Sequence, residues 1–224
     1  MTIYTFKDDP YSSHHRIPEL VRRLSPPGRV LDVGCDEGFA ARDLVKYGFQ
    51  VCGIDKNPVA LKKAALHYQQ TIPADVERDL PTPSGQFEVI IFADILEHLM
   101  DPAAVFQRFT SILAPGGLVV ISVPNVAHWY VRLSLLFGRF EYTSRGILDR
   151  THVRFFTLRT ASRFIDEAGF RIEAVESTPL PLSLTWRWAA PGRPLSFLGK
   201  VGHLLARHWK TLFAYQLIFA IRRK

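Results

Sequence analysis

The sequence predicts an α/β fold built on a doubly wound, mostly parallel sheet. Short apolar runs alternate with segments of helical periodicity along most of the 224 residues, which is typical of this class. The first apolar run, Arg29 to Val33, leads into a turn that holds Gly34 and Gly38 and then into helical spacing. This order of strand, tight turn and helix is the basic unit of such sheets. No internal repeat is present, so a solenoid is not expected.

In the first half of the chain, apolar spacing and turn residues define each expected element. Asn57 is placed to cap one helix, and the segment 25–28, Ser-Pro-Pro-Gly, ends another. The expected helices cover residues 17–24, a segment that begins near 41, and 58–70. The expected strands cover residues 29–33, 51–55 and 72–76.

The second half continues the alternation. The run 87–92 is almost wholly apolar, which indicates a strand buried on both faces. Helices are expected at 101–113, ended by Ala-Pro-Gly-Gly at 114–117, and at 157–168, ended by Gly169. Strands are expected at 118–123, 170–176 and 212–221. Residues 1–224 then form a single domain with an insertion at about 178–210, before the last strand.

Composition excludes several classes of protein. With 47% hydrophobic residues and two cysteines, the chain can bury a core and is not a disulfide-rich secreted domain. The N-terminus lacks the apolar segment of a signal peptide, so we expect a cytoplasmic protein. The formal charge of +7 is uneven, because residues 177–224 hold eight Lys and Arg and no Asp or Glu. Such a local excess predicts a localised anionic partner and disfavours nucleic acid as the partner.

The insertion holds a segment with two distinct faces. On a helical wheel, residues 195–210 separate into an apolar face and a basic face, and Trp186 and Trp188 precede them. A basic amphipathic helix of this kind predicts peripheral membrane contact through residues 186–210, which would place the protein at the inner face of the membrane. The alternative is an ordinary surface helix whose apolar face packs on the domain. The apolar face comprises Phe197, Leu198, Val201, Leu204, Leu205 and Trp209, and the basic face comprises Lys200, His203, Arg207 and Lys210.

The turn after the first strand indicates the kind of ligand. Its spacing is G-x-x-x-G, whereas a dinucleotide-binding turn has G-x-G-x-x-G so that a pyrophosphate can approach the helix N-terminus. Asp36 takes the place of the second glycine, and Asp32 and Glu37 add two more carboxylates. These charges would repel a pyrophosphate and suit a ligand with an ammonium and a sulfonium group. A dinucleotide oxidoreductase is therefore disfavoured.

Two stretches resemble known families. The run V-L-D-V-G-C-D-E-G-F-A from Val30 resembles the first motif of the class I S-adenosylmethionine-dependent methyltransferases, which usually has glycine where Asp36 stands. The run D-I-L-E-H-L-M-D-P from Asp94 resembles the ubiquinone-pathway O-methyltransferases, and this match extends over about residues 29–169. The resemblance implies a Rossmann-like, seven-stranded sheet with a C-terminal antiparallel strand pair. It also implies S-adenosylmethionine as the cofactor.

The resemblance also implies which residues bind that cofactor. Asp32, Gly34 and Gly38 would frame its amino-acid end, and the backbone at Ala93 would lie near the methionine portion. Asp55, at the end of the second strand, would bind the ribose hydroxyls, and Asp75 would meet the adenine amino group. The alternatives are a helix cap for Asp55 and a simple loop acid for Asp75.

Residues after the later strands are expected to bind the acceptor. The motifs P-N-V-A-H-W-Y from Pro124, G-R-F-E-Y-T from Gly138 and D-R-T-H-V-R-F-F-T from Asp149 resemble bacterial methyltransferases encoded with envelope-polysaccharide enzymes, and more loosely a methionine-biosynthesis family. The predicted catalytic bases are His128, His152 and His98, and the predicted substrate-binding residues are Asn125, Tyr142 and Asp149. The alternative is a buried loop network in which each histidine bonds to backbone.

A metal site was a further alternative near the fourth strand. Asp94, Glu97 and His98 could hold a divalent cation, or could serve as a helix cap, a loop brace and a packed histidine. We predict no metal. The predicted function is an S-adenosylmethionine-dependent methyltransferase, most readily an O-methyltransferase that acts on an amphiphilic, lipid-linked, glycan or quinone-like acceptor. The alternative is a non-catalytic partner subunit that keeps the fold.

Overall fold

The structure is a computed structural model that describes residues 9–79, 83–181 and 193–224, with only the backbone described at 193–199. Seven strands form one sheet in the order β3-β2-β1-β4-β5-β7-β6. β7 runs antiparallel to both of its neighbours, and the other pairs are parallel. The predicted doubly wound sheet with an antiparallel C-terminal pair is confirmed. The strands are β1 (Arg29–Val33), β2 (Gln50–Asp55), β3 (Gln70–Pro73), β4 (Phe87–Ala93), β5 (Leu113–Pro124), β6 (Phe170–Thr178) and β7 (Gln216–Arg223).

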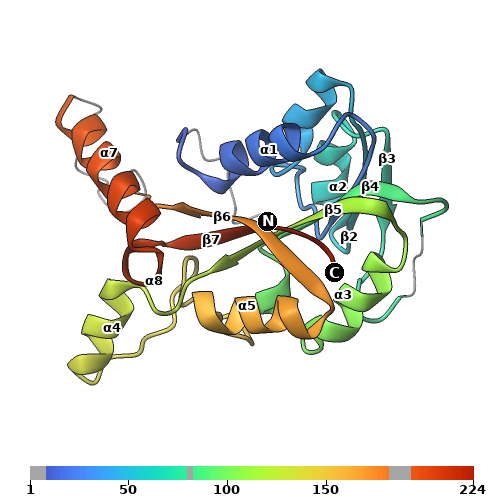
Figure 1. Ribbon diagram of the computed structural model, residues 1–224. Helices are drawn as coiled ribbons and strands as arrows, with labels where there is room; N and C mark the ends of the chain where they lie inside the picture. The colour runs from blue at the N-terminus through green and yellow to red at the C-terminus, as the bar shows by residue number, and fades with distance from the viewer. Residues whose placement is uncertain (1–8, 80–82, 182–192) are drawn as a thin grey trace.

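Helices cover both faces of the sheet (Figure 1). On one face lie α1 (Ser13–Leu24), the short 3-10 helix η1 (Arg42–Tyr47) and α2 (Pro58–Ala64). On the other lie α3 (Pro102–Thr110) and α5 (Leu158–Glu167). The remaining helices are η2 (Leu96–His98), α4 (Trp129–Leu136), α7 (Arg193–His208) and α8 (Lys210–Phe213). In Figure 1, α4, α8 and α7 project at the end of the sheet away from α2 and β3.

The alternation of side chains along β4 divides the core into two clusters. Val89 and Ile91 pack with α1 and α2, whereas Ile90 and Phe92 pack with α3 and α5. All four side chains are fully buried. The prediction that this strand is buried on both faces is confirmed, as expected for the middle of a doubly wound sheet.

Several predicted boundaries were wrong. α2 ends at Ala64 and not at 70, because the backbone N–H of Gln69 already bonds to Val51 and β3 pairs with β2 from Gln70. Residues 114–117 lie within β5 as an irregular stretch, since Leu113 pairs with Phe87 before them. The last strand begins at Gln216, and residues 210–213 form α8.

α4 was not predicted at all. Its segment, Trp129–Leu136, has few of the polar residues that mark one face of an amphipathic helix, and only Val131 is buried. α7 spans Arg193–His208, close to the predicted 195–210. Trp186 and Trp188 lie outside the described residues.

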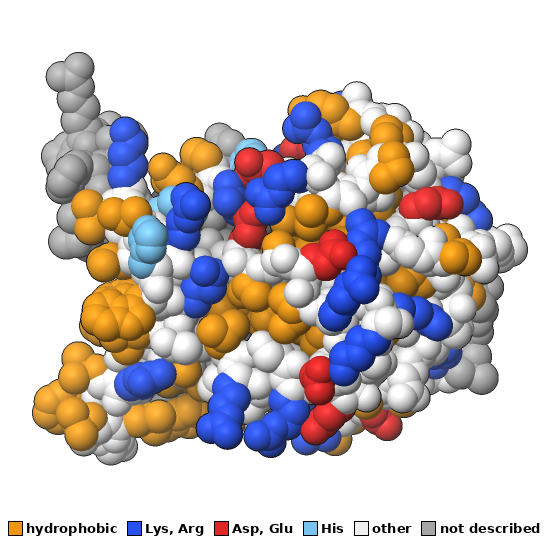
Figure 2. All heavy atoms as spheres, viewed as in Figure 1, with side chains coloured by type: hydrophobic (Ala, Val, Ile, Leu, Met, Phe, Trp, Pro, Cys, Tyr) orange, Lys and Arg blue, Asp and Glu red, His pale blue; other side chains and the backbone are white. Residues whose placement is uncertain are grey.

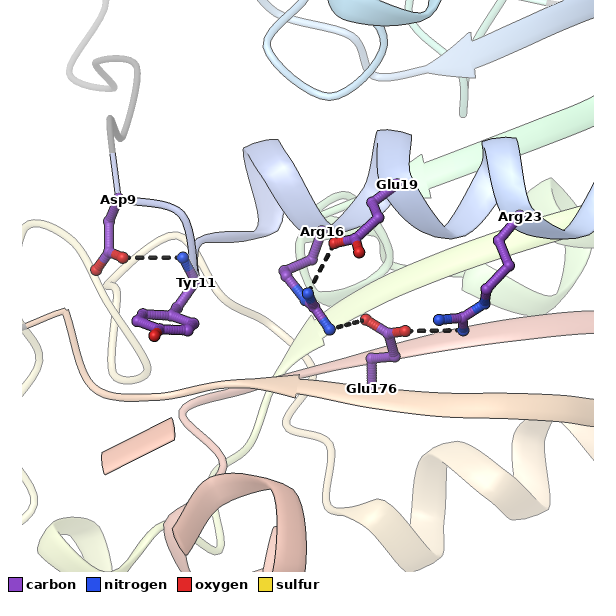
Figure 3. A network of polar contacts seen from close by, with 6 residues as sticks. All are labelled: Asp9, Tyr11, Arg16, Glu19, Arg23 and Glu176. Carbon is purple, nitrogen blue, oxygen red and sulfur yellow. Dashed lines mark hydrogen bonds and ion pairs between the residues drawn. The ribbon is translucent and has the colours of Figure 1, made fainter. Parts of the chain in front are cut away.

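Ion pairs connect α1 to β6 (Figure 3). The Glu176 carboxylate lies between Arg16 at 2.8 Å and Arg23 at 2.9 Å, and Arg16 also contacts Glu19 at 2.7 Å. Just before the helix, the backbone N–H of Tyr11 donates to the Asp9 carboxylate at 2.9 Å. The Glu176 side chain is only 13% exposed, so its ion pairs are screened less than surface pairs.

Removing the Glu176 carboxylate is expected to destabilise the fold. Glu176→Ala leaves the partly buried Arg16 without this acceptor, and hydrogen bonds to charged groups contribute about 2 kcal/mol. We expect urea denaturation to show a loss of about that size, whereas Glu173→Ala, which removes more exposed pairs to Arg171 and Arg222, should cost less. Equal losses from the two variants would contradict a special role for Glu176.

Candidate active site

The turn between β1 and η1 has the backbone geometry of a ligand-binding loop. Gly34, Asp36 and Gly38 all have positive φ, at 72°, 45° and 83°. Asp36 therefore occupies a left-handed conformation where the family motif usually has glycine, and aspartate is among the few residues that tolerate it. The substitution leaves a turn that brings its backbone toward the ends of β1 and β2.

Asp55 connects this turn to β2. One carboxylate oxygen accepts the backbone N–H of Asp36 at 2.8 Å, and the other accepts that of Asn57 at 2.8 Å. Asn57 in turn caps α2 through Val59 and Ala60. The helix cap is therefore Asn57 and not Asp55, which supports the cap residue through its backbone N–H. The ribose role of Asp55 stays a prediction.

Asp32 lies beneath the turn, fully buried. Its Oδ2 accepts the hydroxyl of Tyr68 at 2.6 Å, and that hydroxyl is 3.0 Å from the carbonyl oxygen of Gly38. Burial raises the pKa of Asp32 to about 7, against the opposing effect of the Tyr68 hydrogen bond. In this conformation Asp32 supports the turn through Tyr68, a residue the sequence did not single out. Its direct contact with a cofactor stays a prediction.

Burial and neighbouring carboxylates both act on the Asp36 side chain. Burial, with the nearby Asp55 and Glu37 carboxylates, raises the pKa of Asp36 to about 6. Lys63 contacts Glu37 at 2.6 Å and opposes this shift. The carboxylates around Asp36 create a negative potential that a bound cation would relieve.

Asp75 and Ala93 complete the predicted cofactor residues along the same strand ends. Asp75 follows β3 and is held in a local turn, where its Oδ1 accepts the Glu77 N–H at 3.0 Å. Its backbone N–H donates to Asp79 at 2.7 Å. Ala93 is the last residue of β4 and pairs with Ser122 of β5. Both positions fit the carboxyl-end edge at which open α/β sheets bind ligands.

Glu97, His98 and His152 form a compact polar cluster beyond β4. One ligand atom from each lies within 4.8 Å of the others, and the two imidazole rings meet edge to face at 4.7 Å. Glu97 is 1% exposed and His152 is 7% exposed. These are residue types that suit either proton transfer or a divalent cation.

Asp94 does not belong to this cluster, although the sequence grouped it with Glu97 and His98 as an alternative metal site. Its Oδ1 accepts hydrogen bonds from the Ser122 hydroxyl at 2.6 Å and from the Gln216 amide. Asp94 has φ of 54°, and these bonds hold its side chain toward β5 and β7. His152 takes its place beside Glu97 and His98.

The Asp149 segment brings His152 to this position. The backbone N–H groups of Val153 and Arg154 donate to the carbonyl of Glu97 at 2.9 and 3.0 Å. Asp149, 2% exposed, accepts from the backbone and hydroxyl of Thr151 at 2.9 and 2.7 Å. Asp149 therefore shapes the segment that holds His152, while substrate contact by Asp149 stays a prediction.

Backbone carbonyls fix the orientation of both clustered histidines. The Nδ1 of His152 is 3.0 Å from the carbonyl of Ile147, and that of His98 is 3.2 Å from the carbonyl of Thr151. A carbonyl only accepts, so each Nδ1 carries the hydrogen and each Nε2 keeps its lone pair. Burial and the neighbouring His152 lower the pKa of His98, which keeps that ring neutral.

His128 and Asn125 occupy structural positions instead. His128 is 1% exposed, caps α4 through the N–H of Tyr130 at 3.4 Å, and has its pKa lowered to about 4 by burial. Asn125 is fully buried; its amide donates to the carbonyl of Ala214 at 2.8 Å and accepts from the N–H of Ala127 at 3.1 Å. This is the buried-network alternative for the two residues, and their functional roles remain untested predictions.

Tyr142 differs from the other predicted substrate residues because it is 53% exposed. It packs edge to face on Phe140 at 5.6 Å and lies 6.5 Å from Phe155. Phe155 in turn lies 6.4 Å from the ring of His152. A row of aromatic side chains therefore leads from the surface to the Glu97–His98–His152 cluster.

The sheet order and the carboxylate-lined turn define a class I methyltransferase fold, and comparison with known proteins agrees. A family model described as a methyltransferase domain matches residues 8–175. The chain belongs to this methyltransferase-domain family, as the motif at Val30–Ala40 indicated. Solved structures support the fold: a S-adenosylmethionine-dependent methyltransferase from Archaeoglobus fulgidus has a TM-score of 0.62 at 19% identity and covers 94% of each chain.

Two further relatives show the range of similarity. A ubiquinone biosynthesis O-methyltransferase from Psychrobacter arcticus is 37% identical over 153 residues, which is 63% of this chain and 58% of the relative. The corresponding protein from Xanthomonas axonopodis is 31% identical over 71% of this chain and 70% of its own length. The first of these alignments thus spans a little over half of the relative's length. A magnesium protoporphyrin IX methyltransferase from Synechocystis with bound S-adenosylhomocysteine has a TM-score of 0.63 at 16% identity, over 94% of this chain and 83% of that one.

Proposed function

We propose that the protein transfers the methyl group of S-adenosylmethionine to a hydroxyl of an amphiphilic acceptor, such as a lipid-linked glycan or a quinone-like ring. The observation that carries the proposal is the turn at Gly34–Gly38 after β1, which holds Asp36 beside Asp55. Two histidines whose Nδ1 atoms face carbonyls lie beyond β4, the neighbouring strand. The ubiquinone-pathway names of the relatives support an oxygen acceptor with an apolar tail.

The turn fits this cofactor in both shape and charge. A β-carbon at Gly34 would lie 2.7 Å from the Ile95 side chain, so only glycine allows the turn to pack this closely against the end of β4. The partly buried Asp36 carboxylate would face its ammonium and sulfonium charges, and the Asp55 carboxylate its ribose hydroxyls. When bound, S-adenosylmethionine supplies a methyl group already activated by the positive sulfur.

The protein then has two tasks, positioning and proton removal. We assign proton removal to the Nε2 of His152 or His98, because their Nδ1 atoms are engaged with carbonyls. The neutral state of His98 leaves it able to accept a proton near neutral pH. The aromatic row of Tyr142, Phe140 and Phe155 would hold an apolar or ring-containing acceptor beside them.

Transfer of a labelled methyl group tests the proposal. The protein is incubated with S-adenosylmethionine labelled in the methyl group and with extracts of bacterial lipids, lipid-linked glycans and polar metabolites. We expect labelled product in the lipid-extractable fractions. Conditions that cleave methyl ethers should release the label from that product. Binding of S-adenosylhomocysteine with no label in any extract would instead favour the non-catalytic partner subunit.

The affinity for the cofactor is expected to fall in acid. The pKa of Asp36 is raised to about 6, and the ionised carboxylate attracts the cationic cofactor. Below pH 6 the carboxyl group is mostly protonated, so binding of the cofactor must displace a proton. The Kd for S-adenosylmethionine should therefore rise about tenfold between pH 7 and pH 5. Asp36→Asn should weaken this dependence, whereas Asp43→Asn, which alters a carboxylate paired with Lys46 on η1, should leave it unchanged. Parallel curves for the wild type and Asp36→Asn, measured by calorimetry, would refute the role of Asp36.

A further inference from the structure

Most of the large exposed hydrophobic side chains in the described residues fall in two segments, the α4 region at 129–142 and the α7 region at 201–209. On α4, Leu133 is 46% exposed, Leu136 is 77% exposed and the following Phe137 is 70% exposed. Soluble monomers rarely collect apolar side chains in this way without an interaction to cover them. We call these exposed side chains the α4–α7 surface.

α7 presents its apolar face outward. The sequence alone left open whether this face is exposed or packs on the domain. Leu204 and Trp209 are 56% and 63% exposed. The side toward the domain is instead made by Ala206, which is fully buried, and by His203, whose ring stacks on Tyr11 at 4.4 Å. Among the described apolar residues of α7, Leu204 is 56% exposed and Val201 and Leu205 are each 38% exposed, which favours the outward-facing arrangement.

The two helices lie at the same end of the molecule. The amide of Asn125, just before α4, donates to carbonyls of α8 at 3.3 and 3.4 Å, and the Arg132 guanidinium reaches the same turn at 3.4 Å. α8 follows α7 directly. Figure 2 shows hydrophobic side chains gathered at this end, with Lys and Arg side chains beside them. The apolar groups of both helices can thus meet one partner together.

Charge decides which partner fits. Exposed Arg132, Lys200 and Arg207 lie next to the apolar residues in the sequence. The two segments contain one acidic residue, Glu141, and the chain has no Asp or Glu after Glu176. A second copy of the chain would bring these cations against one another across a two-fold axis. A bilayer with anionic headgroups complements them while its acyl region accepts Leu136, Phe137 and Trp209.

We propose that the α4–α7 surface docks on membranes that contain anionic phospholipid. None of the helices in the described part of the chain is long and apolar enough to cross a bilayer, so the contact would be peripheral. The same end carries the aromatic row of Tyr142 and Phe140 that leads to His152. The suggestion that docking presents a lipid-linked acceptor rests on the proposed function; the docking itself does not.

Vesicle sedimentation tests the docking without cofactor or acceptor. Wild-type protein is spun with vesicles of phosphatidylcholine alone or mixed with phosphatidylglycerol. We expect sedimentation with the mixed vesicles, lost in the double variant Leu136→Asp/Phe137→Asp. The matched control is Leu66→Asp/Met100→Asp, because these side chains are 78% and 66% exposed elsewhere on the surface; it should sediment like the wild type.

Charge reversal provides the second arm. Each Lys or Arg near an anionic surface strengthens binding about fivefold, so Lys200→Glu/Arg207→Glu should weaken partition at least about 30-fold. Lys62→Glu/Arg171→Glu, which changes two exposed cations far from α7 in the sequence, should not. Wild-type protein that stays in the supernatant, or variants that sediment like it, would overturn the proposal. The proposal would also be overturned if light scattering showed a dimer and the Leu136→Asp/Phe137→Asp variant were a monomer, since the surface would then bind a second copy. Calorimetry with S-adenosylhomocysteine separates either failure from a failure of the proposed function.

Discussion

Replacing His152 with alanine is expected to lower kcat by about 10²–10⁴-fold while leaving the affinity for S-adenosylhomocysteine unchanged. That range is typical for the loss of a general base. The expectation rests on the free Nε2 of His152, which is fixed by the bond from Nδ1 to the carbonyl of Ile147. The measurement is single-turnover methyl transfer with the acceptor identified from labelled extracts.

Suitable controls separate chemistry from packing. His67→Ala changes an exposed histidine on the turn after α2 and should keep wild-type kcat. His98→Ala should also slow the reaction, since the rings of His98 and His152 are in contact at 4.7 Å. A purely structural role would lower stability but would not change the pH dependence of kcat. Retention of the wild-type rate in both His152→Ala and His98→Ala would contradict base catalysis by this cluster.

A chelator distinguishes a base from a cation ligand at the same cluster. Glu97, His98 and His152 are close enough to hold a divalent ion, although our expectation is that none is required. Activity should therefore survive dialysis against a chelator. Loss of activity that Mg²⁺ or Zn²⁺ restores, together with loss in Glu97→Gln, would replace the base by a metal site.

Replacing Gly34 with alanine is expected to weaken S-adenosylhomocysteine binding by a factor of ten or more. The substitution meets two obstacles, a φ of 72° and the Ile95 side chain 2.7 Å from the new β-carbon. The left-handed conformation alone costs about 1–2 kcal/mol for a residue with a β-carbon. The contact additionally displaces Ile95 or the turn, which moves the backbone away from the ligand.

Gly116→Ala is the matched control for this variant. Gly116 has nearly the same φ, 70°, but nothing lies within 4 Å of its hypothetical β-carbon. Both variants should lose stability in thermal melts, Gly34→Ala the more because of the Ile95 contact, and only Gly34→Ala should lose affinity. Equal affinity for the two in calorimetry would contradict the placement of the cofactor at this turn.

The sequence predicted those strands and turns whose pattern lies within a few consecutive residues. The apolar run 87–92 and the glycine turn after Val33 each identify a strand or turn within a few residues, and both were placed correctly. α4 was missed because most of its residues are apolar although they are exposed. Without alternating apolar and polar faces, the sequence shows no helical periodicity. The exposure of α4 becomes intelligible only when α7 is found at the same end.

The cofactor turn was predictable for the same reason, whereas the acceptor side was not. Asp36 and Asp55 are joined by a turn bond that follows from adjacent parallel strands. The Tyr68–Asp32 bond crosses 36 residues, and His152 reaches Glu97 only because Val153 and Arg154 bond to the Glu97 carbonyl. Such long-range contacts depend on how loops pack, so the sequence could name His98 and His152 but could not show that their rings lie in contact.

Calorimetric titration with S-adenosylhomocysteine, and separately with NADH, tests the central claim that the Gly34–Gly38 turn binds a sulfonium cofactor. The carboxylates of Asp36 and Asp55 predict micromolar binding of S-adenosylhomocysteine, tighter binding of the cationic S-adenosylmethionine at low salt, and no binding of NADH. Absence of heat with both S-adenosylhomocysteine and S-adenosylmethionine, or binding of NADH at similar affinity, would contradict it.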